Sequence, residues 1–197
     1  MRTVTCLILG VLVGPVSFPL RSEPSDWTWH NPLPNGNFMN DIRAIDGNTA
    51  IAVGDVGTIM KTTDGGQNWY LVDTGALSSL ETVYFIDENR GFIGGFGGIL
   101  LRTIDGGETW LPAVSFINST IQAFYFSDPL NGWAVGGGGI SNNMARTTDG
   151  GETWTPVSTG SNRQLNSIHF ADANTAWAAG VGGTLVHSSD GGATWAP

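Results

Sequence analysis

The sequence predicts an all-β fold of small antiparallel sheets, and three observations lead to this prediction. A unit recurs four times along the 197-residue chain, at intervals of 41 to 44 residues. Each copy holds short apolar runs separated by turn residues, as the strands of an antiparallel meander are. No stretch shows the 3.6-residue periodicity of an amphipathic helix. A four-stranded unit repeated at this spacing is typical of the blades of a β-propeller.

The most regular part of the unit is a turn motif, Ser/Thr-x-Asp-Gly-Gly-x-x-Trp. We expect its carboxylate to accept hydrogen bonds from the backbone N–H groups one or two residues further on. We also expect its glycines to adopt positive φ and its indole ring to pack between sheets. Burying each indole is worth about 2–3 kcal/mol. The predicted structural residues are Asp64, Gly65, Gly66 and Trp69; Asp105, Gly106, Gly107 and Trp110; Asp149, Gly150, Gly151 and Trp154; Asp190, Gly191, Gly192 and Trp195.

A second repeated position lies on the second strand of each unit. It holds a bulky apolar residue in every copy, which predicts a packing site that accepts any large side chain. The residues are Ile51, Phe92, Trp133 and Trp177. The third unit is three residues longer, and we expect the additional residues in a loop within 136–143.

The first twenty residues differ from the remainder of the chain. Arg2 precedes an apolar run over 4–13, which is typical of a secretory signal peptide and too short to span a bilayer comfortably. An N-terminal strand or a retained anchor is the alternative. We therefore predict a signal over 1–20, repeats over 21–197 with blades ending near the four motif tryptophans, and an exported protein without a stable membrane span.

Composition and charge exclude several classes of function. Hydrophobic residues make up 41% of the chain and eight are tryptophan, which argues against disorder. Eight basic against 17 acidic residues give a net charge of −9, which argues against nucleic-acid binding. The single cysteine, Cys6, excludes an internal disulfide framework and a multi-cysteine zinc site.

The repeats carry a specific resemblance to known proteins. Their turn motif resembles the Asp-box, also called the bacterial neuraminidase repeat. The whole unit, with Gly-Trp-Ala-Val-Gly at 132–136 and Leu-Arg-Thr-Ile-Asp-Gly-Gly at 101–107, is similar to the photosystem II stability/assembly factor family over roughly residues 27–195. This resemblance implies an exported or lumenal propeller that acts as an assembly scaffold rather than as an enzyme.

The number of visible units departs from that family. Its plant and cyanobacterial members resemble seven-bladed rings, whereas four units are visible here. One interpretation is a closed four-bladed ring, in which Trp27-Thr28-Trp29 completes the last blade. The other, which we favour, is a truncated part of a longer propeller, because an open ring leaves an unprotected β-edge.

A cationic or ionisable residue stands three positions before each motif aspartate. This cation row consists of Lys61, Arg102, Arg146 and His187. Equivalent positions trace a ring in a propeller, so the row is a candidate docking surface for a protein partner that is acidic or rich in amides. The alternative is that each side chain stacks on a tryptophan or pairs with a local acid.

Catalysis is the third hypothesis, because Asp-boxes also occur in sialidases. Such enzymes need converging arginines, a tyrosine nucleophile and a further acid. The Arg-Ile-Pro motif that is characteristic of sialidases is absent from this sequence. Tyr84 and Tyr125 occupy the same position in two repeat units, which is expected of core residues. Four identical turns also argue against one active site or calcium site. The histidines lack metal spacing, and the glycine run 136–139 lacks the Lys-Ser/Thr of a phosphate loop.

These observations lead to one preferred function and two alternatives. We predict a non-catalytic, secreted binding or scaffold module that engages a protein partner and needs no cofactor or metal. A bacterial extracellular surface or adhesion module, with carbohydrate as an alternative ligand, is the second hypothesis. A sialidase-like glycoside hydrolase is the enzymatic alternative.

Overall fold

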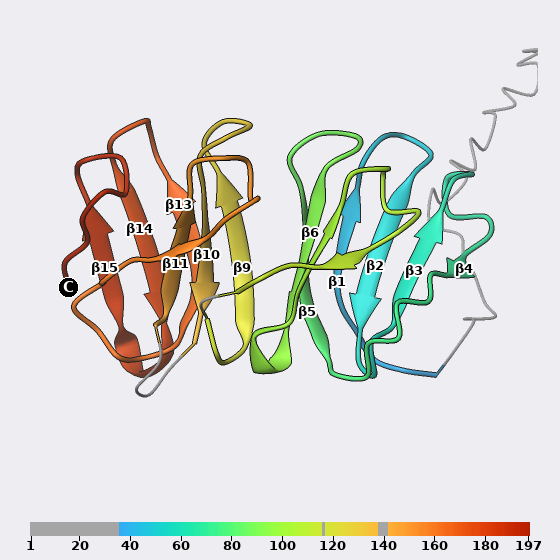
Figure 1. Cartoon of the computed structure of the whole chain (residues 1–197), viewed down its shortest axis with the longest axis horizontal. Coiled ribbons are helices and arrows are strands. Elements are labelled where there is room, and N and C mark those ends of the chain that lie inside the picture. Colours follow the sequence, from blue (N-terminus) through green and yellow to red (C-terminus); the bar gives the residue numbers. More distant parts are fainter. Residues whose placement is uncertain (1–35, 116, 138–141) are drawn as a thin grey trace, which may run out of the picture.

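The computed structural model describes residues 36–115, 117–137 and 142–197, and over these residues the chain is all-β as predicted. Four antiparallel sheets follow one another along the chain (Figure 1). Two short 3-10 turns, η1 (Phe96–Gly98) and η2 (Val181–Gly183), accompany the strands. The described residues include no helix long and apolar enough to cross a bilayer. The predicted signal over 1–20 and the closing segment at Trp27 lie outside the described residues.

Each sheet is built from strands in chain order. The first comprises β1 (Met39–Ala44), β2 (Ala50–Gly54), β3 (Ile59–Thr62) and β4 (Tyr70–Leu71); the second β5 (Leu80–Phe85), β6 (Gly91–Gly95), β7 (Leu100–Thr103) and β8 (Leu111–Pro112); the third β9 (Ile121–Phe126), β10 (Gly132–Gly136), β11 (Met144–Thr147) and β12 (Thr155–Pro156); the fourth β13 (Leu165–Phe170), β14 (Ala176–Gly180) and β15 (Leu185–Ser188). In the fourth sheet, Ala196 forms a β-bridge with His187 where the other sheets have their last strand.

The Asp-box turn joins the third and fourth strands of a sheet. The insertion expected in a loop of the third unit falls between β10 and β11, and residues 138–141 within it lie outside the described part.

The four sheets of the described residues form an open arc, which is a partial propeller. The first strands are neighbours in the order β1, β5, β9 and β13, and they therefore form the inner edge of the arc. The first and fourth sheets lie at opposite ends of the molecule in Figure 1.

The hydrophobic core is divided into three clusters, one for each pair of adjacent sheets. Ile51 belongs to the cluster between the first two sheets, Phe92 to the next, and Trp133 to the last. Phe92 stacks on Phe126 of the following sheet at 5.5 Å between ring centroids and meets Trp154 edge-on at 5.9 Å. The predicted packing role of the second-strand position is therefore confirmed for these three residues.

Each interface depends on the second glycine of an Asp-box. Gly107 and Gly151 have φ of +81° and +84°. A Cβ on Gly107 would overlap Ile51 of the preceding sheet, and one on Gly151 would overlap Phe92. The glycine thus serves two needs at once, a left-handed backbone and close approach to the neighbouring sheet.

We expect Gly107→Ala to destabilise the protein more than a glycine replacement in an open turn. The left-handed conformation alone costs about 1–2 kcal/mol, and the overlap with Ile51 raises the total to about 2–4 kcal/mol. Gly97 is the matched control, because its φ is +73° and nothing lies within 4 Å of its added Cβ. Urea unfolding of both variants measures the difference, and equal losses would show that sheet contact plays no part.

Candidate functional site

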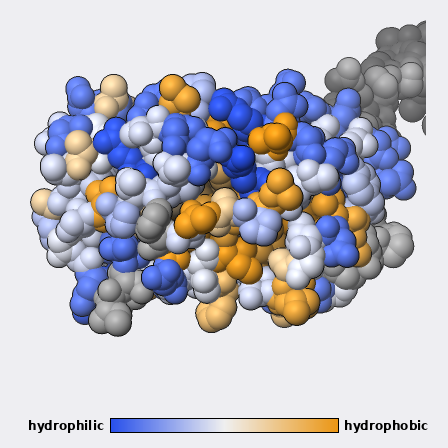
Figure 2. Space-filling view, viewed as in Figure 1, coloured by the Kyte–Doolittle hydropathy of each residue, from blue (hydrophilic) through white to orange (hydrophobic). Residues whose placement is uncertain are grey.

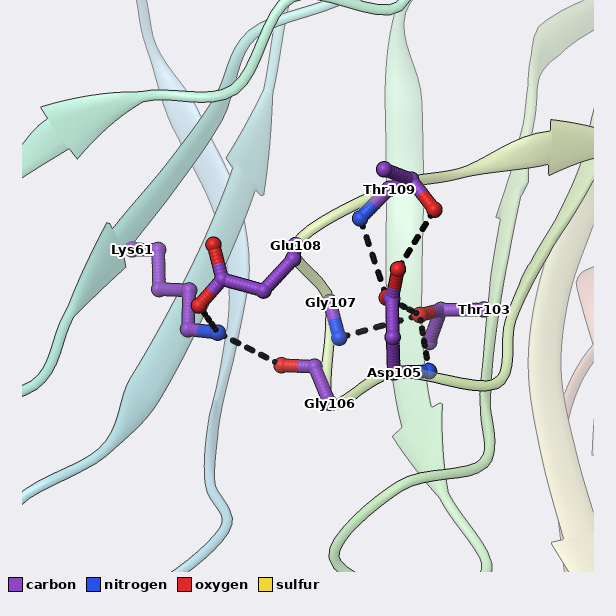
Figure 3. Close-up of polar contacts among 7 residues, drawn as sticks. All are labelled: Lys61, Thr103, Asp105, Gly106, Gly107, Glu108 and Thr109. Atoms are coloured by element: carbon purple, nitrogen blue, oxygen red, sulfur yellow. Dashed lines mark hydrogen bonds and ion pairs between the residues drawn. The ribbon is translucent and has the colours of Figure 1, made fainter.

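The Asp-box carboxylate closes its own turn, as the second unit shows (Figure 3). The hydroxyl of Thr103 donates to Asp105 Oδ1 at 2.7 Å, and the backbone N–H of Thr109 donates to the same oxygen at 3.0 Å. The Thr109 hydroxyl donates to Asp105 Oδ2 at 2.6 Å. The N–H of Gly107 donates to the Thr103 hydroxyl at 2.9 Å.

This network corrects one detail of the sequence-based expectation. The backbone N–H that binds the carboxylate lies four residues on, at Thr109, and not one or two. The reason is that the N–H of Gly107 is taken by the hydroxyl of Thr103, which stands two positions before the aspartate. The Ser/Thr that opens the motif is therefore part of the turn.

The same turn keeps all four carboxylates ionised. The pKa of Asp64, Asp105, Asp149 and Asp190 is lowered to about 2 in each case. For Asp64 the main cause is a hydrogen bond from the backbone N–H of Asn68, followed by one from the side-chain amide of the same residue. For Asp149 and Asp190 it is a threonine hydroxyl, and for Asp105 the effect of burial, which raises the pKa, is outweighed by the bonds from Thr109.

Such carboxylates are poor candidates for acid–base chemistry. A general acid needs a pKa near the working pH, and these groups titrate far below it. They also belong to four different sheets. In the described part of the chain, no group of three or more His, Cys, Asp or Glu side chains could hold a metal ion.

The cation row lies where one sheet meets the next. Lys61 is 3% exposed, and its Nζ donates to the carbonyl of Gly106 at 2.9 Å and to Glu108 Oε1 at 2.6 Å, both in the Asp-box turn of the second sheet (Figure 3). Arg102 forms the equivalent ion pair with Glu152 of the third sheet. Both cations therefore join adjacent sheets.

Arg146 and His187, the last two members of the cation row, are not paired with an acid of a following sheet in the described residues. The fourth Asp-box has Ala193 where the second and third have glutamate. The guanidinium of Arg146 lies over the ring of Trp133 at 5.2 Å, and its buried Nε has no hydrogen-bond partner among the described residues. His187 is exposed and lies 5.0 Å from the ring of Trp177. A docking role for the row stays a prediction.

A repeated feature of the inner strands was not predicted. Each first strand contains a β-bulge, which leaves one residue out of the ladder of Cα partners. We call these residues the rim row: Asn40, Glu81, Gln122 and Asn166. Bulges commonly redirect a side chain beside a functional site. Aligning the four copies would have shown that this position is polar in every unit.

The rim row can make hydrogen bonds along the inner edge of the arc. Asn40 and Asn166 are exposed, whereas Glu81 and Gln122 are half-buried. The Asn40 Nδ2 donates to the carbonyl of Leu80 on the neighbouring first strand at 3.0 Å. Asn40 Nδ2 also donates to Asp55 Oδ1 at 3.2 Å, and Asn166 Oδ1 accepts from Gln164 Nε2 at 3.0 Å. The other amide and carboxylate groups of the row are donors and acceptors of the kinds that pair with a polypeptide backbone.

We expect Asp105→Ala to lower stability by about 1–2 kcal/mol at neutral pH, because the turn loses the acceptor for one N–H and two O–H groups. The folded pKa is about 2 and lies below the ordinary 3.8, so this contribution is present above pH 4 and is lost as the pH falls through about 2. Thermal unfolding across this pH range measures the gap between variant and parent. An unchanged melting temperature at pH 7 would contradict the structural role.

We expect Ala193→Glu to stabilise the protein, because it places an acid where the second and third Asp-boxes pair with the preceding sheet. A partly exposed pair with Arg146 is worth about 0.5–1 kcal/mol. Ala193→Gln is the matched control without the charge. Denaturant titration at low and high salt separates the two, since screening weakens the ion pair alone. An equal effect of Glu and Gln would disprove the pairing.

Comparison with known proteins agrees with this architecture. The family model of the photosynthesis system II assembly factor YCF48 matches residues 21–112 and 113–197. YCF48 bound to D1 peptide is similar in structure, with a TM-score of 0.55 and 20% identity over 87% of this chain and 84% of that one. The computationally designed Ika4 protein gives a TM-score of 0.63 at 16% identity, over 80% of this chain and 94% of that one.

An enzyme is also among the structural neighbours. An ancestral GH74 enzyme has a TM-score of 0.68 and 19% identity over 82% of this chain, which spans only 24% of that protein. At these identities, the structural likeness shows the shared fold. No curated protein is a significant sequence match. Since the family model covers both halves of the repeat region, the chain belongs to the family of the photosystem II assembly factor YCF48.

Proposed function

We propose that this chain is a non-catalytic, exported module that binds a polypeptide segment of a protein partner. The observation that carries the proposal is that its most regular polar groups, the Asp-box carboxylates, are used within their own turns. The family to which the chain belongs is described as an assembly factor, and YCF48 is seen with a D1 peptide. Both support binding as the activity.

The similarity to GH74 enzymes does not favour catalysis in this chain. Hydrolysis of a glycoside needs two carboxyl groups that face one bond. The repeated carboxylates stand on separate sheets, and their pKa of about 2 leaves no proton to donate at neutral pH. A carbohydrate ligand or an adhesion role is the second candidate, on the sequence evidence alone.

The rim row is the surface that suits a peptide best. A peptide backbone presents alternating N–H and C=O groups, and the rim row offers amide donors and acceptors at equivalent positions on adjacent strands. Members of the cation row that bind the next sheet have less freedom to contact a partner. Lys61 in particular is buried.

The test is a calorimetric titration of the purified chain with the D1 peptide that YCF48 binds. We expect saturable binding, weakened about five- to tenfold by Gln122→Ala or Asn166→Ala, since each removes one or two hydrogen bonds. Asn89→Ala, in an exposed turn of the second sheet, is the matched control and should bind as the parent does.

Two further measurements test the remaining parts of the proposal. Fluorogenic glycosides, a sialoside among them, should not be hydrolysed, and turnover that survives purification would contradict a non-catalytic role. Export is tested by fractionating cells that express the chain with residues 1–20 present or removed. Retention of the complete chain inside the cell would contradict it. In the peptide titration, failure of the D1 peptide to bind the parent chain would contradict the peptide-binding role. Unchanged binding by both Gln122→Ala and Asn166→Ala would reject the rim row as the binding surface.

A further inference from the structure

The same two half-surfaces meet at each of the three interfaces between sheets. One half, the forward face, holds the bulky second-strand residue and the cation of one sheet. The other half, the receiving face, holds the Asp-box turn and the first-strand apolar residues of the next sheet. Phe92 illustrates the contact, because it meets Phe124 and Trp154 of the third sheet and lies against Gly151.

The forward face of the fourth sheet is uncovered in the described structure. Trp177 is 40% exposed, whereas its equivalents Ile51, Phe92 and Trp133 are 2% exposed or less. Leu185 is 56% exposed, although the corresponding residues Ile59, Leu100 and Met144 are at most 4% exposed. The fourth sheet therefore has internal-type residues on a face that no described sheet covers.

The receiving face of the first sheet is likewise not covered by any described sheet. Ile42 is 60% exposed, whereas its equivalents Val83, Phe124 and Ile168 are at most 7% exposed. Trp69 is half-buried, unlike the other three Asp-box tryptophans. A Cβ added to Gly66 would meet only Trp69 of the same turn, whereas a Cβ on Gly107 or Gly151 would meet a side chain of the preceding sheet.

Among the described residues, the outer faces of the first and fourth sheets are not polar. Terminal repeats of open arrays carry a polar outer face, because an apolar one would be exposed to water. Here Trp177 and Leu185 remain apolar at one end, and Ile42 remains apolar at the other. The chain thus presents two complementary halves of an interface that it already forms three times.

We propose that two copies of this chain associate head to tail. The forward face of the fourth sheet of one copy packs on the receiving face of the first sheet of the other, and the reverse contact closes the ring. Trp177 then covers Gly66 of the second copy, and His187 reaches the position of Gln67, which corresponds to Glu108 and Glu152. Two copies give eight sheets, within the four to eight blades of known propellers, whereas three copies would exceed that range.

The test is the mass of the purified chain in solution, measured by light scattering and by sedimentation over a concentration series. We expect a mass of two chains. Trp177→Glu places a charge on the forward face in both contacts of the pair, and Ile42→Glu places one on the receiving face in both. Each variant should therefore have the mass of one chain. Both side chains are exposed within a single copy, and circular dichroism checks that folding is retained. Leu185→Glu replaces Trp177→Glu if that variant does not fold.

Mixing the two variants tests the direction of association. Trp177→Glu keeps an intact first sheet and Ile42→Glu an intact fourth sheet, so tagged and untagged forms should associate through one contact. Val114→Glu is the matched control, because Val114 is 74% exposed in the loop between the second and third sheets. This control should keep the mass of two chains.

Several results would overturn the proposal. These are a single-chain mass throughout the concentration series, a two-chain mass that persists in both face variants, and an assembly larger than two copies. Failure of the mixed variants to associate would show that like faces meet, which excludes the head-to-tail arrangement. None of these results bears on peptide binding at the rim row, so the two proposals can fail separately.

Discussion

The fold depends on how closely the Asp-box turn of one sheet approaches the second strand of the sheet before it. That approach is possible because the second glycine of the motif has no Cβ, and the large side chains of Ile51, Phe92 and Trp133 fill the space. The resulting clusters exclude water between the sheets. The aspartate has a supporting role, since its bonds to Ser/Thr and the following backbone hold the glycine in place.

This use of the motif gives the most regular charged groups of the repeat a structural role. The charged groups that recur most regularly are bound within turns or between sheets, as Asp105 is by Thr109 and Lys61 is by Glu108. The bulged positions of the inner strands, where we propose that a peptide binds, are polar without being regularly charged. Hydrophobic residues also remain on the outside, and Figure 2 shows them gathered near the middle of one face, below a hydrophilic upper edge.

Local patterns in the sequence were sufficient to predict the strand order and the packing of Ile51, Phe92 and Trp133. They were not sufficient to predict the exposure of Trp177 or the hydrogen bond from the backbone N–H of Thr109 to Asp105. Turn motifs mark where strands end, and the bulky second-strand residue recurs at a fixed distance from each turn. The pairing of Lys61 with Glu108 could not be found this way, because it joins positions 47 residues apart that become neighbours only when two sheets pack. The rim row was missed for a different reason: a polar residue on a short strand is common, and only the ladder of Cα partners shows that it stands at a bulge.

The distribution of charge also restricts the kind of partner. Of the few basic residues in the described chain, Lys61, Arg90 and Arg102 pair with acids, and Arg43 and Arg146 lie over aromatic rings. The net charge of −9 is therefore carried by a surface whose cations are largely engaged. Such a surface repels an acidic partner at long range and admits a neutral or basic one. The proposed recognition of a peptide by the amides of the rim row agrees with this charge distribution, because hydrogen bonds to a peptide backbone need no opposite charge on the partner.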